Sequence, residues 1–213
     1  MKLLLTSAGI TNQSIADTLL DLVGKSADET KIVVIPTAGN VEPDTKDWYL
    51  GQFANLQKHG YQWIDIVDPS ASGVEWKERL KVADVVFVSG GNTFHLLDQL
   101  RKTGLDKWLT DKLDRIVYVG ASAGSIITGP TIGISGVEPA DPNLPGLKDL
   151  TGLGWVDFEI SPHSPDDISY ESNQAYAKTA SHKLYAIDDA TAIKVVDDVV
   201  EVISEGRYKE FKQ

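Results

Sequence analysis

The segment Gly120-Ala121-Ser122-Ala123-Gly124 has the clearest potential for chemistry in this sequence. An apolar run precedes it and a helical pattern follows it. This is the setting of a nucleophile elbow, a tight strand-to-helix turn that presents a serine. Small neighbours suit such a turn, and the amides of the following helix favour negative charge at the serine. The pattern predicts Ser122 as a nucleophile, and the alternative is a chance match to an ordinary turn.

A serine nucleophile needs a general base, and the chain has four histidines. His59 and His182 are predicted at a helix end and in a solvated turn. His95 follows the loop Gly90-Gly91-Asn92-Thr93, whereas His163 lies in the loop Pro162-His163-Ser164-Pro165. Because prolines restrict the backbone around His163, we favour it as the base. His95 remains the alternative.

The tetrahedral intermediate of acyl transfer also needs amide donors that form an oxyanion hole. The amide of Ala123 directly follows the nucleophile and is the first candidate. Gly90 and Gly91 let the backbone come close to a substrate oxygen, because they have no side chains. Asn92 is predicted to add a donor or to cap the next helix. Together with Thr93, these residues form the predicted oxyanion and substrate-binding set.

The elements that must position these residues alternate between apolar runs and helical patterns over the first 130 residues. Strands are predicted at 2–6, 31–36, 63–67, 84–89 and 116–119, and helices at 14–23, 44–59, 76–82, 94–100 and 105–113. Strands that are apolar throughout indicate a parallel sheet covered on both faces. The expected fold is therefore α/β, a doubly wound, mostly parallel, flavodoxin-like sheet in three layers, with ligands bound beyond the carboxyl ends of its strands.

The last third of the sequence has a different character. Residues 129–154 are rich in Gly and Pro and are expected to form loops over the site. Beyond them a strand is predicted at 158–161, a helix at 166–180, and closing strands at 184–187, 192–196 and 199–203. Because no repeat or linker interrupts the chain, residues 1–213 are expected to form a single catalytic domain.

Composition excludes several classes of function. The net charge is −11, so no basic surplus exists for nucleic-acid binding. No stretch approaches the roughly 18 apolar residues of a membrane span. With no cysteine and no His-Glu-x-x-His motif, we expect neither a metal nor a cofactor. The sequence predicts a cytoplasmic protein, and it is compatible with a homodimer.

Four segments together resemble the dipeptidase E and cyanophycinase family of serine peptidases. They are Ser89-Gly90-Gly91-Asn92-Thr93-Phe94, Gly120-Ala121-Ser122-Ala123-Gly124-Ser125, Ser161-Pro162-His163 and the run 186–192. The resemblance implies a fold like that of class I glutamine amidotransferases. It also implies Ser122 as nucleophile, His163 as base and no cofactor.

At the position of the third catalytic residue, the sequence matches the family less closely. Asp189 stands where the resemblance leads us to expect a glutamate, one methylene longer. Asp141 is the competing carboxylate, because the chain order Ser-Asp-His of the α/β-hydrolases favours it. We favour Asp189, which the family resemblance supports.

The resemblance implies a serine-type exopeptidase that cleaves short peptides, including N-terminal aspartyl dipeptides. An aspartyl side chain would need a nearby cation, yet the predicted site loops contain no arginine, and Lys148 is the nearest basic candidate. A free amino terminus could instead be bound by acidic residues, of which the candidates are Glu138, Asp141, Asp166 and Asp167. The alternatives are an esterase or amidase acting on other substrates, and a non-catalytic small-molecule binding domain.

Overall fold

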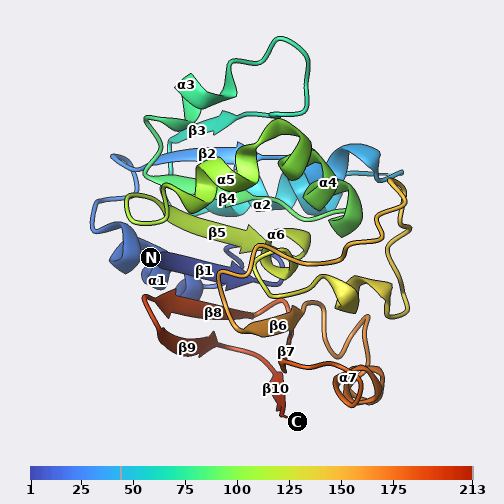
Figure 1. Ribbon diagram of the computed structural model, residues 1–213. Helices are drawn as coiled ribbons and strands as arrows, with labels where there is room; N and C mark the ends of the chain where they lie inside the picture. The colour runs from blue at the N-terminus through green and yellow to red at the C-terminus, as the bar shows by residue number, and fades with distance from the viewer. Residues whose placement is uncertain (44, 213) are drawn as a thin grey trace.

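The computed structural model describes residues 1–43 and 45–212, and its central feature is a seven-stranded sheet in the order β3-β2-β4-β5-β1-β8-β9 (Figure 1). Its strands are β1 (Lys2–Thr6), β2 (Lys31–Ile35), β3 (Trp63–Ile66), β4 (Val85–Val88), β5 (Val117–Ala121), β8 (Thr191–Val196) and β9 (Val199–Ser204). The first five pair in parallel, and β8 and β9 add antiparallel strands beside β1. The mostly parallel sheet confirms the predicted fold class.

Helices cover both faces of this sheet, as the apolar strands predict. Along β1, Leu3 and Leu5 pack into one hydrophobic cluster and Leu4 into another, because successive side chains point to opposite faces. One face is covered by α1 (Gln13–Val23) and α2 (Asp47–Lys58). The other is covered by α3 (Trp76–Leu80), α4 (Thr93–Thr103) and α5 (Leu105–Thr110). The predicted start of the second helix, Asp44, lies outside the described residues.

The strand order explains where the site forms. Strands β2 to β5 follow the flavodoxin-like order, and β1 takes the position of the fifth strand, next to β5. The carboxyl ends of β1, β2, β4 and β5 therefore share one edge of the sheet. The loops that leave this edge include the short helices η1 (Thr37–Val41) and α6 (Ala123–Ile126).

A second, smaller sheet lies beside the first and has the order β10-β7-β6. It contains β6 (Phe158–Ser161), β7 (Lys183–Ile187) and β10 (Tyr208–Phe211), and α7 (Tyr170–Ala177) packs near it (Figure 1). The sequence analysis did not predict β10 or the separate sheet. The helix predicted from residue 166 begins only at Tyr170, because the Ser169 side chain caps it by accepting the amide of Ser172.

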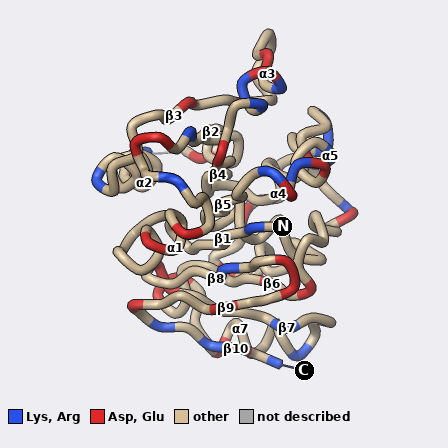
Figure 2. The backbone as a smooth tube through the Cα atoms, turned by 90° about the vertical axis from the view of Figure 1, so that its left-hand side faces the viewer, with Lys and Arg blue, Asp and Glu red and all other residues tan. Residues whose placement is uncertain are grey.

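The long segment between α6 and β6 is irregular, as predicted, except for the short helix η2 (Gly133–Gly136). On the side of the molecule turned to the viewer in Figure 2, Lys and Arg are scattered among Asp and Glu and do not form a basic stripe. In the part of the chain that the structure describes, no helix combines the length and the apolar character needed to cross a membrane.

Candidate active site

Ser122 and Ser7 lie side by side at the carboxyl edge of the large sheet. Strands β1 and β5 pair in parallel with Thr6 opposite Ala121, so the residue after each strand emerges at the same place. The amide of Ser122 continues this pairing by donating to the carbonyl of Thr6 at 3.1 Å. The register of two buried strands thus sets the position of the predicted nucleophile.

The backbone of Ser122 has the conformation of a nucleophile elbow. Its φ of 49° and ψ of −112° are rare for a residue with a side chain. The turn requires glycine at Gly124, where a Cβ would lie 2.2 Å from the carbonyl oxygen of Val88. This close approach of α6 to β4 explains why the Gly-x-Ser-x-Gly pattern carries small residues.

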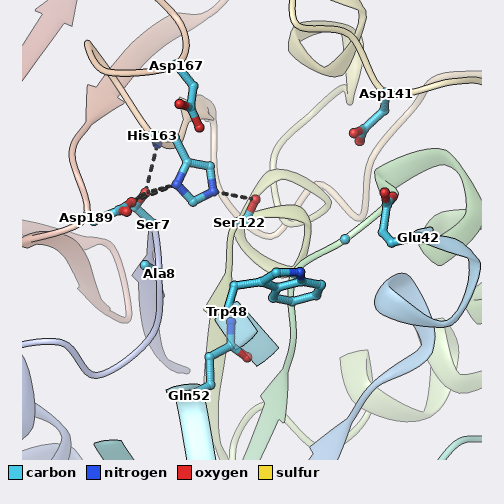
Figure 3. A pocket seen from close by; sticks show the side chains of 12 residues that line it. Ser7, Ala8, Glu42, Trp48, Gln52, Ser122, Asp141, His163, Asp167 and Asp189 are labelled. Carbon is cyan, nitrogen blue, oxygen red and sulfur yellow. Dashed lines mark hydrogen bonds and ion pairs between the residues drawn. The ribbon is translucent and has the colours of Figure 1, made fainter. Parts of the chain in front are cut away.

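His163 reaches Ser122 from the other sheet. It follows β6, and its Nε2 lies 3.1 Å from the Ser122 Oγ (Figure 3). The His163 backbone has a positive φ of 55°. The carbonyl of Ile187 in β7 accepts the amide of the next residue, Ser164, and holds the loop. The structure thus brings His163, and not His95, to the serine.

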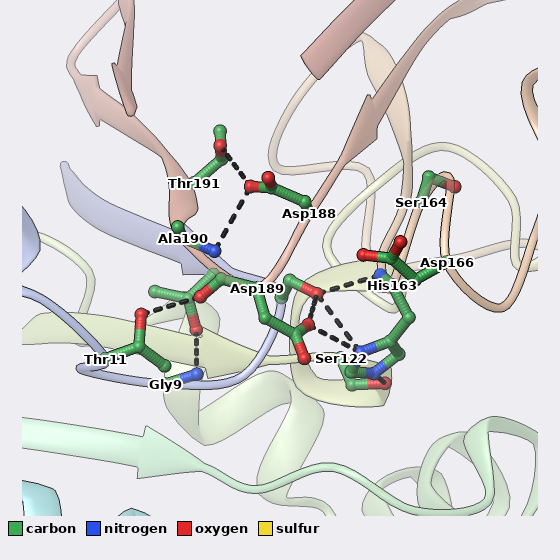
Figure 4. Close-up of polar contacts among 12 residues, drawn as sticks. Gly9, Thr11, Ser122, His163, Ser164, Asp166, Asp188, Asp189, Ala190 and Thr191 are labelled. Carbon is green, nitrogen blue, oxygen red and sulfur yellow. Dashed lines mark hydrogen bonds and ion pairs between the residues drawn. The ribbon is translucent and has the colours of Figure 1, made fainter. Parts of the chain in front are cut away.

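Asp189 completes a Ser-His-Asp arrangement. It follows β7, and its Oδ1 lies 2.7 Å from the Nδ1 of His163. The hydrogen bonds from His163 and Ser7 hold the pKa of Asp189 below its usual range, although partial burial opposes them. The turn is fixed on one side by Thr11, which donates to the backbone carbonyl of Asp189 (Figure 4). On the other side Asp188 accepts from Ala190 and Thr191.

The Gly90-Gly91 loop lies directly beside the nucleophile. A Cβ on Gly90 would be only 3.1 Å from the Cβ of Ser122. Gly91 has a φ of 126°, and a Cβ there would overlap the backbone of Ala38. Ala123 is the first residue of α6, so its amide has no acceptor within the helix. These positions suit the amide donors predicted around a substrate oxygen.

Asn92 caps the next helix, which is one of the two roles predicted for it. Its Oδ1 caps α4 by accepting the amide of His95, and its Nδ2 donates to the carbonyl of Pro142. Both ends of the carboxamide are therefore engaged. The amide of Thr93 is also engaged, because it donates to Asp141 Oδ2 at 2.8 Å.

Comparison with known proteins identifies the family. Residues 3–203 match the model of peptidase family S51. The chain belongs to peptidase family S51. An uncharacterised peptidase of Pasteurella multocida is 34% identical over 183 residues, covering 84% of this chain and 87% of the relative. A peptidase E of Streptomyces coelicolor is 40% identical over 89 residues, covering 41% of this chain and 35% of the relative.

A solved structure supports the same relationship. The crystal structure of a candidate peptidase E protein from Listeria monocytogenes has a TM-score of 0.80 and 25% identity to this S51 chain. The match covers 96% of this chain and 98% of the other. These findings confirm the predicted family, fold and peptidase class.

The site of this S51 peptidase opens into a pocket of about 450 Å³ that Ser122 and His163 line. Four carboxylates also line it, and no Lys or Arg does so among the described residues. The acidic residues are Glu42, Asp141, Asp167 and Asp189. The pocket is therefore strongly acidic.

Glu42 and Asp141 turn their carboxylates toward one another on the side of the pocket away from His163 (Figure 3). Burial raises the pKa of Asp141. Burial, and then the charge of Asp141, raise the pKa of Glu42. Lys46 lies near Glu42 and its charge opposes this rise in pKa, while its ammonium group donates to the backbone carbonyl of Glu42. A positive group in the pocket would relieve the repulsion between the two carboxylates.

The other residues suggested from the sequence lie elsewhere. His95 is in α4, where burial lowers its pKa. Asp166 forms an ion pair with Arg207, whose Nη2 lies 2.9 Å from both carboxylate oxygens. Lys148 and Glu138 are exposed and do not line the pocket.

The sequence analysis missed five residues of the pocket, Ser7, Ala8, Glu42, Trp48 and Gln52. Ser7 and Ala8 directly follow β1, and α2 carries Trp48 and Gln52. Trp48 is 41% exposed and lies at the pocket. A signal for Ser7 existed, because it follows a buried strand at the edge where the elbow was expected.

Proposed function

We propose that this S51 peptidase is a serine exopeptidase that cleaves short peptides through an acyl-enzyme on Ser122. The observation that carries the proposal is the continuous chain of contacts from Ser122 Oγ through His163 to Asp189. In such an arrangement the histidine takes the proton of the serine hydroxyl and the carboxylate stabilises the imidazolium, which makes the serine a nucleophile at neutral pH.

In the proposed first step, Ser122 Oγ attacks the scissile carbonyl carbon and its proton passes to His163 Nε2. Asp189 stabilises the imidazolium that forms. The amides of Ala123 and Gly91 hold the oxyanion. When the intermediate collapses, the C–N bond breaks and His163 gives the proton to the leaving amine. The acyl group stays on Ser122 as an ester.

In the second step, water attacks this ester while His163 takes one of its protons. The ester bond to Ser122 then breaks, and His163 returns the proton to the serine oxygen. The enzyme is regenerated, and the acid product leaves. Atoms and protons balance over the cycle, which needs only water as co-substrate.

The acidic pocket supports the exopeptidase part of the proposal. A free α-ammonium group placed between Glu42 and Asp141 would pair with two partly buried carboxylates, which an internal peptide bond cannot do. The same charges would repel an aspartyl side chain. We therefore propose peptides with a free amine and a non-acidic first residue as substrates.

Ser122→Ala tests the nucleophile. It should remove hydrolysis of free-amine dipeptides by at least about 10³-fold in kcat while thermal unfolding is unchanged. Full activity of the variant would refute the proposal. Labelling by a fluorophosphonate should likewise require Ser122.

Matched substrates test the specificity. The dipeptides Ala-Xaa, Asp-Xaa and N-acetyl-Ala-Xaa differ at the first residue, where Asp adds a negative side chain and acetylation removes the positive charge of the amine. The proposal expects the highest kcat/KM for Ala-Xaa. Faster cleavage of the acetylated substrate would favour the alternative of an amidase or esterase, and faster cleavage of Asp-Xaa would reject the proposed role of the acidic pair.

A further inference from the structure

Ser7 makes contacts that the proposed mechanism does not use. The residue is fully buried. Its hydroxyl donates to Asp189 Oδ1 at 2.6 Å and accepts the backbone amide of His163 at 2.8 Å (Figure 3). The same oxygen lies 3.3 Å from the His163 Nδ1. One hydroxyl thus contacts both residues that assist Ser122.

These contacts join two separate sheets. Ser122 follows β5 of the large sheet, whereas His163 and Asp189 follow β6 and β7 of the small one. Ser7 follows β1, which is hydrogen-bonded along its whole length to β5 and β8. Its hydroxyl therefore ties the base and the carboxylate to the strand that also fixes the nucleophile.

Asp189 has few other means of holding its orientation. Its side chain is 60% exposed, so water competes for its oxygens and little packing restrains it. The hydroxyl of Ser7 is a buried donor at a fixed place, and it binds the same oxygen that faces His163.

We propose that Ser7 is a positioning residue, whose hydroxyl fixes Asp189 and the His163 backbone so that the imidazole faces Ser122. This inference rests on the proposed function of Ser122. Ser7 acts through His163 and Asp189, so its loss affects the chemical step and spares the binding of the substrate amine at Glu42 and Asp141.

Ser7→Thr and Ser7→Val test the inference, because their side chains have nearly the same shape and only threonine keeps a hydroxyl. Relative to the threonine variant, the valine variant should lose about 10- to 100-fold in kcat, with KM changed less than about threefold. Ser7→Ala, which adds no bulk, should show the same loss and keeps the test valid if valine prevents folding.

The pH profile separates positioning from a general structural role. Ser7 donates to the same Asp189 oxygen that faces His163, so its removal changes the charge and the orientation that the imidazolium meets. The acid limb of kcat/KM should therefore shift in Ser7→Ala and Ser7→Val but not in Ser7→Thr. A variant that is merely less stable would leave the limb in place.

Thr30→Val is the matched control. Thr30 is also fully buried, and its hydroxyl donates to the carbonyl of Ser26, far from the site in the sequence and in the fold. The Thr30→Val variant should have lower thermal stability with unchanged kcat and an unchanged acid limb.

Wild-type kcat and pH profile in both Ser7→Ala and Ser7→Val would overturn the inference. Ser122→Ala, measured alongside, tests the proposed function separately, because its full activity would refute that function whatever the Ser7 variants do.

Discussion

The serine and histidine that meet at the site both have backbone conformations that side chains disfavour. The φ angles of Ser122 and His163 are 49° and 55°. Each such residue costs on the order of 1–3 kcal/mol and persists only where its surroundings hold it. For Ser122 the surroundings are the pairing of its amide with Thr6, and for His163 they are the hydroxyl of Ser7. Strain is thus concentrated at the two residues that the proposed mechanism needs to aim at one another.

Asp141→Asn should weaken the binding of free-amine substrates. It removes one charge of the acidic pair, so KM for Ala-Xaa should rise by about tenfold at neutral pH, with little change for an N-acetylated substrate. In the wild type, burial raises the pKa of Asp141, so acidification protonates it at a higher pH than an ordinary aspartate and should raise KM in the same way. Steady-state kinetics of both substrates across pH would check this, and an unchanged KM for Ala-Xaa would contradict it.

The same substitution should stabilise the free enzyme. A carboxyl whose pKa is raised on folding binds more protons folded than unfolded, so its contribution to stability falls as pH rises through that pKa. Removing the charge should therefore increase the thermal midpoint by roughly 2 °C at pH 8 and by less at pH 5. Thermal unfolding at both pH values measures this. A lower midpoint at pH 8 would contradict the expectation that the charged Asp141 carboxylate destabilises the free enzyme.

At the scale of elements, the turn after β7 carries Asp189 and is held by its buried neighbour Asp188. The Asp188 carboxylate accepts from the amide of Ala190 and from the hydroxyl of Thr191 (Figure 4). It also accepts the amide of Arg207. Gly206 packs so closely that a Cβ there would lie 2.2 Å from Asp188 Oδ2. The segment between β9 and β10 therefore supports the turn between β7 and β8.

Asp188→Ala should disturb both stability and catalysis. It leaves three donors without their acceptor, which should cost about 2–3 kcal/mol of unfolding free energy. Because the turn also carries Asp189, kcat should fall by about tenfold or more with KM nearly unchanged. Denaturant unfolding and steady-state kinetics check the two effects. Asp21→Ala, at an exposed site on α1, is the control and should change neither.

Elements that depend on local pattern could be predicted from the sequence, and those that depend on distant partners could not. The buried strands and the β8–β9 hairpin follow from apolar runs and from the Asp197-Asp198 turn. Strand β10 could not be predicted, because Tyr208–Phe211 is short and gains its partner only when β7 lies beside it. Ser7 has no local signal as a partner of Asp189, since 182 positions separate them. Asp189 itself was favoured only through the family resemblance, because sequence order alone favoured Asp141.

At the scale of the whole molecule, the net charge of the chain and the lining of the pocket both favour cationic substrates. The chain has a net charge of −11, and the pocket at the sheet edge is lined by four carboxylates. A low-dielectric cleft of one sign concentrates substrates of the opposite sign, and salt weakens this effect over a Debye length of about 10 Å at 0.1 M. The acidic composition, which the sequence analysis used only to exclude nucleic-acid binding, thus gains a proposed role in substrate capture.

Added salt should therefore affect substrates according to their charge. For a peptide amide with a free amine and net charge +1, kcat/KM should fall by about two- to fivefold as NaCl rises from about 10 mM to about 200 mM, because capture of the cation by the acidic pocket is screened. The N-acetylated amide of the same peptide is uncharged and should change little. Steady-state measurements at fixed pH, with KCl as a second salt to exclude a specific ion effect, would check this.

A fall of equal size for both substrates would show that salt acts on the enzyme rather than on the attraction between the cationic substrate and the acidic pocket. An increase for the cationic substrate would contradict a cation-binding pocket.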